Sequence, residues 1–125
     1  MKYISIFALL FILGCGARVP VENLKLVNNA ELKNASKLKI FTLESSRQPD
    51  QKFDIISIVE AYSCKNMTWD PPASKGDALK RLRLEAYRVG ADAIVDVTFD
   101  KAGTDTWGTN CWNSVYASGQ AIKYQ

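Results

Sequence analysis

The sequence predicts a small two-layer α+β domain in which one helix packs on a sheet of about four strands, in the order β-β-α-β-β. Two pairs of segments rich in branched and aromatic residues flank a single helical stretch. Apolar residues within that stretch recur every three or four positions, which places them on one helical face. The chain has 125 residues, so its folded part is short enough for a single hydrophobic core.

The first two strands are predicted at residues 38–43 and 54–62, where isoleucine and valine are frequent. Residues 48–51, Gln-Pro-Asp-Gln, are typical of a turn between them. The second strand leads directly into Cys64. These two strands therefore precede the helix and form one half of the expected sheet.

A loop at residues 65–73 contains Trp-Asp-Pro-Pro, and its two prolines exclude a regular helix or strand ladder there. Ser74 then has the character of a helix N-cap, with Asp77 three residues later. Gly90 is suited to a left-handed C-terminal cap. A helix is expected at residues 75–89, and its apolar face comprises Leu79, Leu82, Ala86 and Val89.

The last two strands are predicted at residues 93–100 and 111–124, joined by a loop rich in glycine and threonine. Alanine, valine and phenylalanine alternate with other residues in the first of these strands, which gives it one clearly apolar face. Alternation in the final strand places Val115, Ala117, Gly119 and Ala121 on one side.

The N-terminus has the features of a bacterial lipoprotein signal. Lys2 precedes an apolar run at residues 4–13, and Ile-Leu-Gly-Cys ending at Cys15 resembles a lipobox. We expect a signal peptide at residues 1–14, a lipidated Cys15 with a tether to residue 37, and a periplasmic domain at residues 38–125. An ordinary cleaved signal peptide is one alternative. A membrane-spanning helix is another, although the apolar run is shorter than the ~20 residues that spanning needs.

Composition argues against several classes of function. There is no histidine, and no phosphate-binding or nucleophile motif is present, so neither catalysis nor a bound metal or cofactor is expected. A formal charge of +3 gives no indication of nucleic-acid binding. The membrane is an expected partner through the lipid on Cys15, and nucleic acid is not an expected partner.

Cysteine usage predicts one disulfide. If Cys15 is lipidated, Cys64 and Cys111 remain as an even pair in an exported and therefore oxidising environment. A bond between them would close a long loop and stabilise a small core. The alternative is two free buried thiols.

The predicted helix also carries a basic surface that consists of Lys80, Arg81, Arg83 and Arg88. One interpretation is a surface that binds an anion or a partner protein. The other is an ordinary solvated helix exterior, whose cations lie favourably near the helix C-terminus.

Several short motifs, taken together with the lipobox, resemble the RcsF family of outer-membrane lipoproteins that sense envelope stress for the Rcs phosphorelay. They are Ser63-Cys64, Pro71-Pro72, the helical Leu79, Arg81 and Leu82, Gly-Ala-Asp-Ala-Ile-Val at residues 90–95, Cys111-Trp112 and Ser-Gly-Gln-Ala-Ile at residues 118–122. The resemblance implies a disulfide-bonded α/β domain, with one family disulfide at Cys64 and Cys111. The second falls at Phe99 and Ala117, where we expect a packed pair of neighbours instead.

The resemblance implies an outer-membrane-anchored, non-catalytic envelope-stress sensor or signalling adaptor. It also implies that the partners are envelope proteins, either an outer-membrane barrel or an inner-membrane signalling regulator. Gly16 after the lipobox cysteine also favours the outer membrane. The segment at residues 16–37 has a single proline, unlike the long Pro-rich segment of that family, so contact with the inner membrane is less expected. The alternatives are a structural or accessory envelope lipoprotein without a signalling role and, least expected, an enzyme or small-ligand binder.

Overall fold

A computed structural model describes residues 22–65, 68–101 and 111–125 and confirms the α+β fold class. The predicted signal peptide and Cys15 lie outside the described residues, as do nine positions of the predicted loop at residues 101–110. The elements in chain order are η1 (Leu24–Leu26), α1 (Asn29–Ala35), β1 (Lys39–Thr42), β2 (Phe53–Lys65), α2 (Lys75–Arg88), β3 (Ala93–Lys101) and β4 (Asn113–Tyr124).

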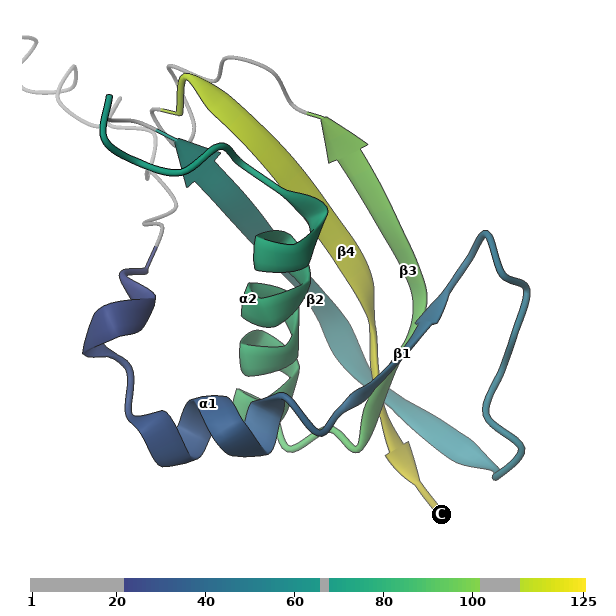
Figure 1. The fold of residues 1–125 in the computed structure, drawn as a ribbon. Helices are drawn as coiled ribbons and strands as arrows, with labels where there is room; N and C mark the ends of the chain where they lie inside the picture. Colours follow the sequence, from purple (N-terminus) through teal and green to yellow (C-terminus); the bar gives the residue numbers. More distant parts are fainter. Residues whose placement is uncertain (1–21, 66–67, 102–110) are drawn as a thin grey trace, which may run out of the picture.

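The four strands form one mixed sheet in the order β1-β3-β4-β2 (Figure 1). β1 runs parallel to β3, whereas β4 is antiparallel to both β3 and β2. The two outer strands of the sheet, β1 and β2, are therefore the first two in the chain. β4 lies between β2 and β3, the strands that precede and follow α2 in the sequence. α2 crosses one face of this sheet.

The predicted start and the capping residues of α2 are confirmed, and the helix ends at Arg88, one residue before the predicted end at Val89. The Ser74 hydroxyl accepts a hydrogen bond from the Asp77 amide at 3.1 Å, which satisfies one of the free donors of the first turn. Gly90 follows the helix with a φ of 82°, a left-handed conformation that glycine adopts without a steric cost. The Ala91 amide then donates to the Ala86 carbonyl at 3.0 Å and closes the C-terminal cap.

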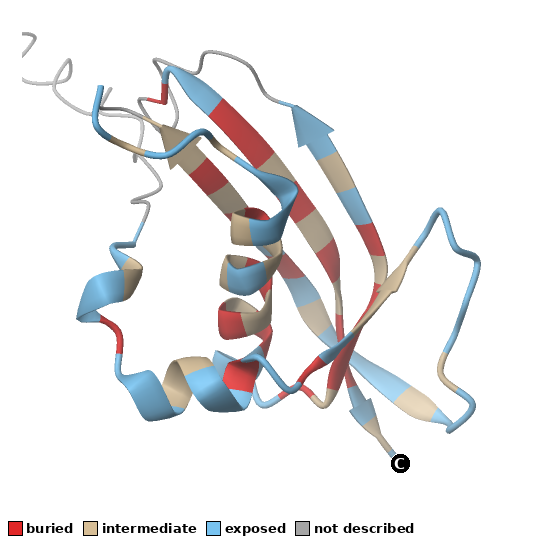
Figure 2. Cartoon of the chain, viewed as in Figure 1, coloured by how far each residue is buried: buried red, intermediate tan, exposed pale blue. Residues whose placement is uncertain are grey.

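The core lies between α2 and the sheet (Figure 2). Three fully buried helix residues, Ala78, Leu82 and Ala86, face small strand residues that include Ala61, Ala117 and Ala121. Alanines on both layers allow the helix to approach the sheet closely, because little side-chain volume separates the two backbones. Of the residues predicted on this helical face, Leu79 is partly buried and Val89 is exposed.

Phe99 and Ala117 are direct partners across β3 and β4, so their predicted proximity is confirmed. Both belong to the helix-covered core, where Ala117 is fully buried and Phe99 is partly buried. The Lys75 ammonium lies over the Phe99 ring, 5.3 Å from its centre, in a cation–π contact.

The described part of the predicted tether is not a simple spacer. Residues 22–37 contain η1 and α1, and α1 packs on α2 (Figure 1). Val27 and Ala35 are buried there with Leu84 of α2, while Leu24 and Leu32 are partly buried against them. α1 has only seven residues, and a helix of this length is marginal on its own. It therefore depends on tertiary contacts, which the sequence of this segment does not show. We call residues 22–38 the N-terminal strap.

Candidate functional site

Three of the four residues in the predicted basic surface of α2, namely Arg81, Arg83 and Arg88, bind the protein's own N-terminal strap. Their role as a surface for an anion or a partner stays a prediction. The Arg83 Nε donates to the Leu38 carbonyl at 3.0 Å. The Arg81 Nε pairs with the Asp77 carboxylate at 2.9 Å, and its Nη1 donates to the Glu22 carbonyl. Arginine suits this purpose because its planar fork donates several hydrogen bonds in fixed directions.

Arg88 makes the densest set of these contacts. Its Nη1 and Nη2 bind the two carboxylate oxygens of Glu22 at 2.7 and 3.0 Å, and its Nε binds Glu31 at 2.8 Å. Hydrogen bonding to the guanidinium lowers the pKa of Glu22 below its ordinary value near 4.5, and the two glutamates raise the pKa of Arg88. Of the four predicted basic residues, Lys80 alone has a side chain that makes no hydrogen bond or ion pair with the described part of the chain.

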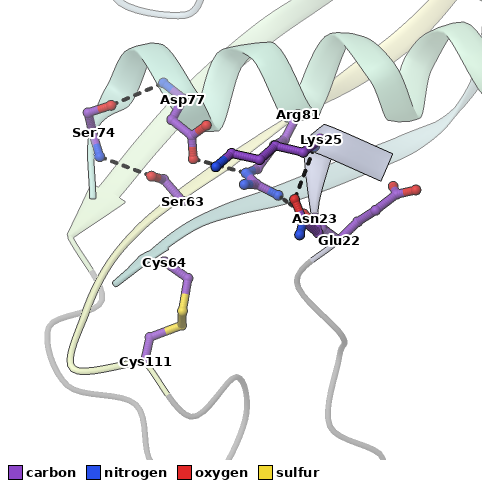
Figure 3. Close-up of polar contacts among 9 residues, drawn as sticks. All are labelled: Glu22, Asn23, Lys25, Ser63, Cys64, Ser74, Asp77, Arg81 and Cys111. Carbon is purple, nitrogen blue, oxygen red and sulfur yellow. Dashed lines mark hydrogen bonds and ion pairs between the residues drawn. A yellow bond between two sulfur atoms is a disulfide. The ribbon is translucent and has the colours of Figure 1, made fainter. Parts of the chain in front are cut away.

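A groove of about 680 Å³ opens where the strap, the end of β2 and the start of α2 meet (Figure 3). Its lining includes three cations, three carboxylates and an aromatic side chain: Lys25, Lys80, Arg81, Glu22, Asp70, Asp77 and Trp69. Arg81 lies between Asp77 and the strap, so it holds the two walls together. The Ser74 amide donates to the Ser63 hydroxyl at 3.0 Å, which fixes the helix start to β2.

The predicted disulfide between Cys64 and Cys111 is confirmed and lies beside this groove (Figure 3). The two Cα atoms are 5.4 Å apart, within the range that a disulfide requires. Cys111 is fully buried, and the Trp112 amide donates to the Lys65 carbonyl at 2.8 Å. The bond therefore ties the end of β2 to the chain that enters β4.

The proline-containing loop contributes an exposed aromatic side chain to the groove. Trp69 is 80% exposed, and Leu26 of the neighbouring η1 is 85% exposed, the two highest values among large apolar side chains in the described ranges. Lys25 and Lys80 are exposed around the same groove. The sequence placed the tryptophan in a loop, but Leu26 and Lys25 come from a segment that sequence reasoning treated as a spacer.

The free edge of β2 is a second candidate site. β2 pairs with β4 on one side only and ends the sheet, so the backbone groups of its outer edge have no strand partner. Ile58 is 69% exposed, and Ile55 and Ile56 are also exposed. Ile56 occupies a shift in the register between Ile55 and Ser57, which indicates a bulge. Sequence reasoning found this strand but could not show that it lies at an edge.

The open face of β2 and β4 is otherwise polar and aromatic. The Tyr62 and Tyr116 rings lie 4.9 Å apart at an angle of 45°, on directly paired positions. Burial raises the pKa of Tyr116, and a hydrogen bond with Glu60 raises it further. This tyrosine therefore stays neutral at physiological pH and acts as a packing and hydrogen-bonding group.

Together these features define a small α+β domain that is covered by one helix and stapled by one disulfide. Residues 57–125 match the model of the YbjQ-type family, whose description is "putative heavy-metal-binding", and the chain belongs to this family. No curated protein matches the chain significantly.

The fold is shared with a crystal structure of a protein of unknown function, of the DUF74 family, from Pediococcus pentosaceus. The TM-score is 0.51 at 18% identity, over 70% of this chain and 98% of that chain. The predicted RcsF resemblance is therefore wrong, because the family match is to YbjQ-type proteins. The motifs that suggested RcsF describe a helix, a following strand and two cysteines, and each of these is only weakly specific for one family.

The heavy-metal description does not fit the residues that the structure describes. No group of three or more His, Cys, Asp or Glu side chains comes together within residues 22–65, 68–101 and 111–125. Soft metals prefer thiolate or imidazole ligands, yet the chain has no histidine and Cys64 and Cys111 are bonded to each other. The same ranges contain no helix long and apolar enough to cross a membrane.

Proposed function

We propose that this protein is a lipid-anchored, non-catalytic lipoprotein of the outer membrane that faces the periplasm and acts by binding other envelope proteins, as a sensor or adaptor. The lipobox-like sequence at Cys15 supports the anchor. The Cys64–Cys111 disulfide supports an oxidising compartment, where such bonds persist. The anchor and the disulfide are compatible only if the domain is exported.

The observation that carries the proposed mode of action is the free edge of β2. Ile55, Ile56 and Ile58 make this edge unusually apolar for an outer strand, since edge strands of monomers are commonly protected by charges. An extended segment of a partner protein can add to such an edge through main-chain hydrogen bonds, and apolar pockets then give selectivity. We therefore assign partner binding to β2 and not to the basic face of α2.

Two measurements test this proposal. First, the mass of the protein extracted from membranes should show a lipidated cysteine at position 15, and Cys15→Ser should abolish both lipid and membrane retention. Second, a photo-crosslinking amino acid at position 58 should capture one discrete envelope protein in cells. The same group at Tyr87, which is exposed on α2, is the matched control and should capture none.

The crosslinking experiment also separates the functional alternatives. A sensor or adaptor should show a change in crosslink yield at position 58 when the envelope is stressed. A yield that stays constant would favour a structural or accessory lipoprotein. A crosslink to a second copy alone, or equal crosslinks from positions 58 and 87, would contradict partner binding at the β2 edge.

A further inference from the structure

The strap determines which end of the domain lies next to the lipid anchor. Seven residue steps separate Cys15 from Glu22, a distance of at most about 25 Å for a fully extended chain. Glu22 is fixed on α2 by Arg81 and Arg88 and lines the groove beside the disulfide. If Cys15 is lipidated, the groove end must therefore stay close to the bilayer surface.

The side chains at this end have the chemistry of a membrane interface. Trp69 and Leu26 are the two most exposed large apolar side chains among the residues described. Tryptophan is enriched at the level of lipid headgroups, where its ring is in apolar surroundings and its N–H reaches polar groups. Lys25 and Lys80 are exposed and line the same groove as Trp69, and Leu26 follows Lys25 in η1. Lysine side chains can place an apolar stem along lipid and a charge at the phosphates.

We infer that Trp69, Leu26, Lys25 and Lys80 form a membrane-docking face, which rests in the headgroup region of the bilayer that holds the lipid anchor. This inference rests on the lipid anchor of the proposed function. A contact of this size is weak for a free protein. The anchor makes the contact intramolecular, and the high effective concentration near the surface is sufficient to favour it.

Docking in this orientation leaves the β2 edge available to partners. β2 runs from the C-terminal end of the domain toward the groove (Figure 1). Six residue steps along this strand separate Ile58 from Cys64, which corresponds to roughly 20 Å. The membrane-docking face therefore lies at one end of β2, whereas the three isoleucines lie in its first half, so that one can be occupied without blocking the other.

The inference can be tested by fluorescence quenching of the full lipidated protein in vesicles of phosphatidylethanolamine and phosphatidylglycerol. Trp107→Phe and Trp112→Phe leave Trp69 as the only tryptophan. Lipids brominated near the headgroup end of the acyl chain should quench its emission, and vesicle binding should shift that emission to the blue. A matched control carries Ile58→Trp with all three native tryptophans replaced, and its emission should be the same with and without bromine.

The outcomes separate this inference from the proposed anchor. Protein that does not float with the vesicles would overturn the anchor and the docking face together. Protein that floats, but whose Trp69 emission is not quenched, would overturn the docking face alone, as would equal quenching at positions 69 and 58.

A charge variant tests the role of the lysines in docking. Lys25→Gln with Lys80→Gln should reduce quenching in vesicles with phosphatidylglycerol, whereas Lys52→Gln at the far end of β2 should have no effect. Equal quenching in the parent protein, the Lys25→Gln with Lys80→Gln variant and the Lys52→Gln variant would show that the two lysines do not contribute to docking.

Discussion

Arg88 binds both carboxylate oxygens of Glu22 at 2.7 and 3.0 Å across 66 positions of sequence. This pair joins the C-terminal turn of α2 to the first described residue of the strap. It is partly exposed, so its contribution to global stability is small, of the order expected for surface ion pairs. Its effect is local, because it holds the start of the strap, where η1 contains no buried residue.

Glu22→Gln should therefore loosen the strap without unfolding the domain. We expect faster hydrogen exchange at the amides of α1, little change in exchange in β4, and a melting temperature close to that of the wild type. Lys123→Gln, which removes another exposed ion pair, with Asp92, is the control and should leave α1 unchanged. Unchanged exchange in α1 of the Glu22 variant would show that apolar contacts alone hold the strap.

The same pair predicts a dependence on pH. The pKa of Glu22 is lowered in the folded protein, so its stabilising contribution is complete above its ordinary value near 4.5 and is lost as the pH falls through the folded pKa. Protection of α1 in the wild type should decline below about pH 4.5, toward the level that the Glu22→Gln variant shows at neutral pH. A wild type that tracks the variant at every pH would contradict this assignment.

The sequence was sufficient for features that depend on local pattern. Ser74 and Gly90 predicted the two ends of α2, and alternation predicted the strands. The cysteine count predicted the Cys64–Cys111 bond. The strap was missed because α1 is stable only through contacts with Leu84 and Arg88, which are distant in sequence. For the same reason, the basic residues of α2 could not be assigned to contacts within the protein, and nothing in the pattern of β2 showed that it lies at an edge.

The pairing of Phe99 with Ala117 predicts that a second disulfide can be introduced. Phe99→Cys with Ala117→Cys places two cysteines on directly opposed positions of the same sheet face, where the Cβ atoms of paired residues are close. The exported variant, with a bond between residues 99 and 117, should have a mass two hydrogens lower than the same variant with these two cysteines reduced. Thr98→Cys with Ala117→Cys is the control and should stay reduced, because neighbouring residues of a strand point to opposite faces.

Truncation of Phe99 should cost less than truncation of a fully buried ring. Phe99 is only partly buried, so Phe99→Ala should lower the free energy of unfolding by less than the ~3–5 kcal/mol typical of buried Phe. Urea unfolding followed by circular dichroism measures this value. Phe99→Leu, which keeps most of the apolar contact, should lie between the wild type and the alanine variant.

The Cys64–Cys111 bond should contribute much of the domain's stability. Its two cysteines are separated by 47 positions, and the chain-entropy model gives about 4 kcal/mol for a loop of this length. Cys64→Ser with Cys111→Ser should lower the urea midpoint by an amount that corresponds to this free energy. Dithiothreitol should reproduce the loss in the wild type and have no effect on the serine variant. If the wild type and the serine variant, each with and without dithiothreitol, had the same urea midpoint, the bond would not contribute to stability.

The oxidised protein should not bind soft heavy metals, although its family is described by such binding. The only described cysteines are joined to each other, and the described residues bring together no cluster of three potential ligands. A binding metal raises stability by mass action, so cadmium or zinc should leave the melting temperature of the oxidised protein unchanged.

Reduction should change this result in a defined way. It frees the thiols of Cys64 and Cys111, which lie next to each other in the fold. Two thiolates can then bind cadmium. This binding should be weak, because such metals usually take four sulfur or nitrogen ligands. Cadmium should therefore offset part of the stability lost on reduction, and Cys64→Ser with Cys111→Ser should remove this effect. Tight cadmium binding by the oxidised protein that persists in the serine variant would contradict the argument, because it would require ligands from outside the described residues.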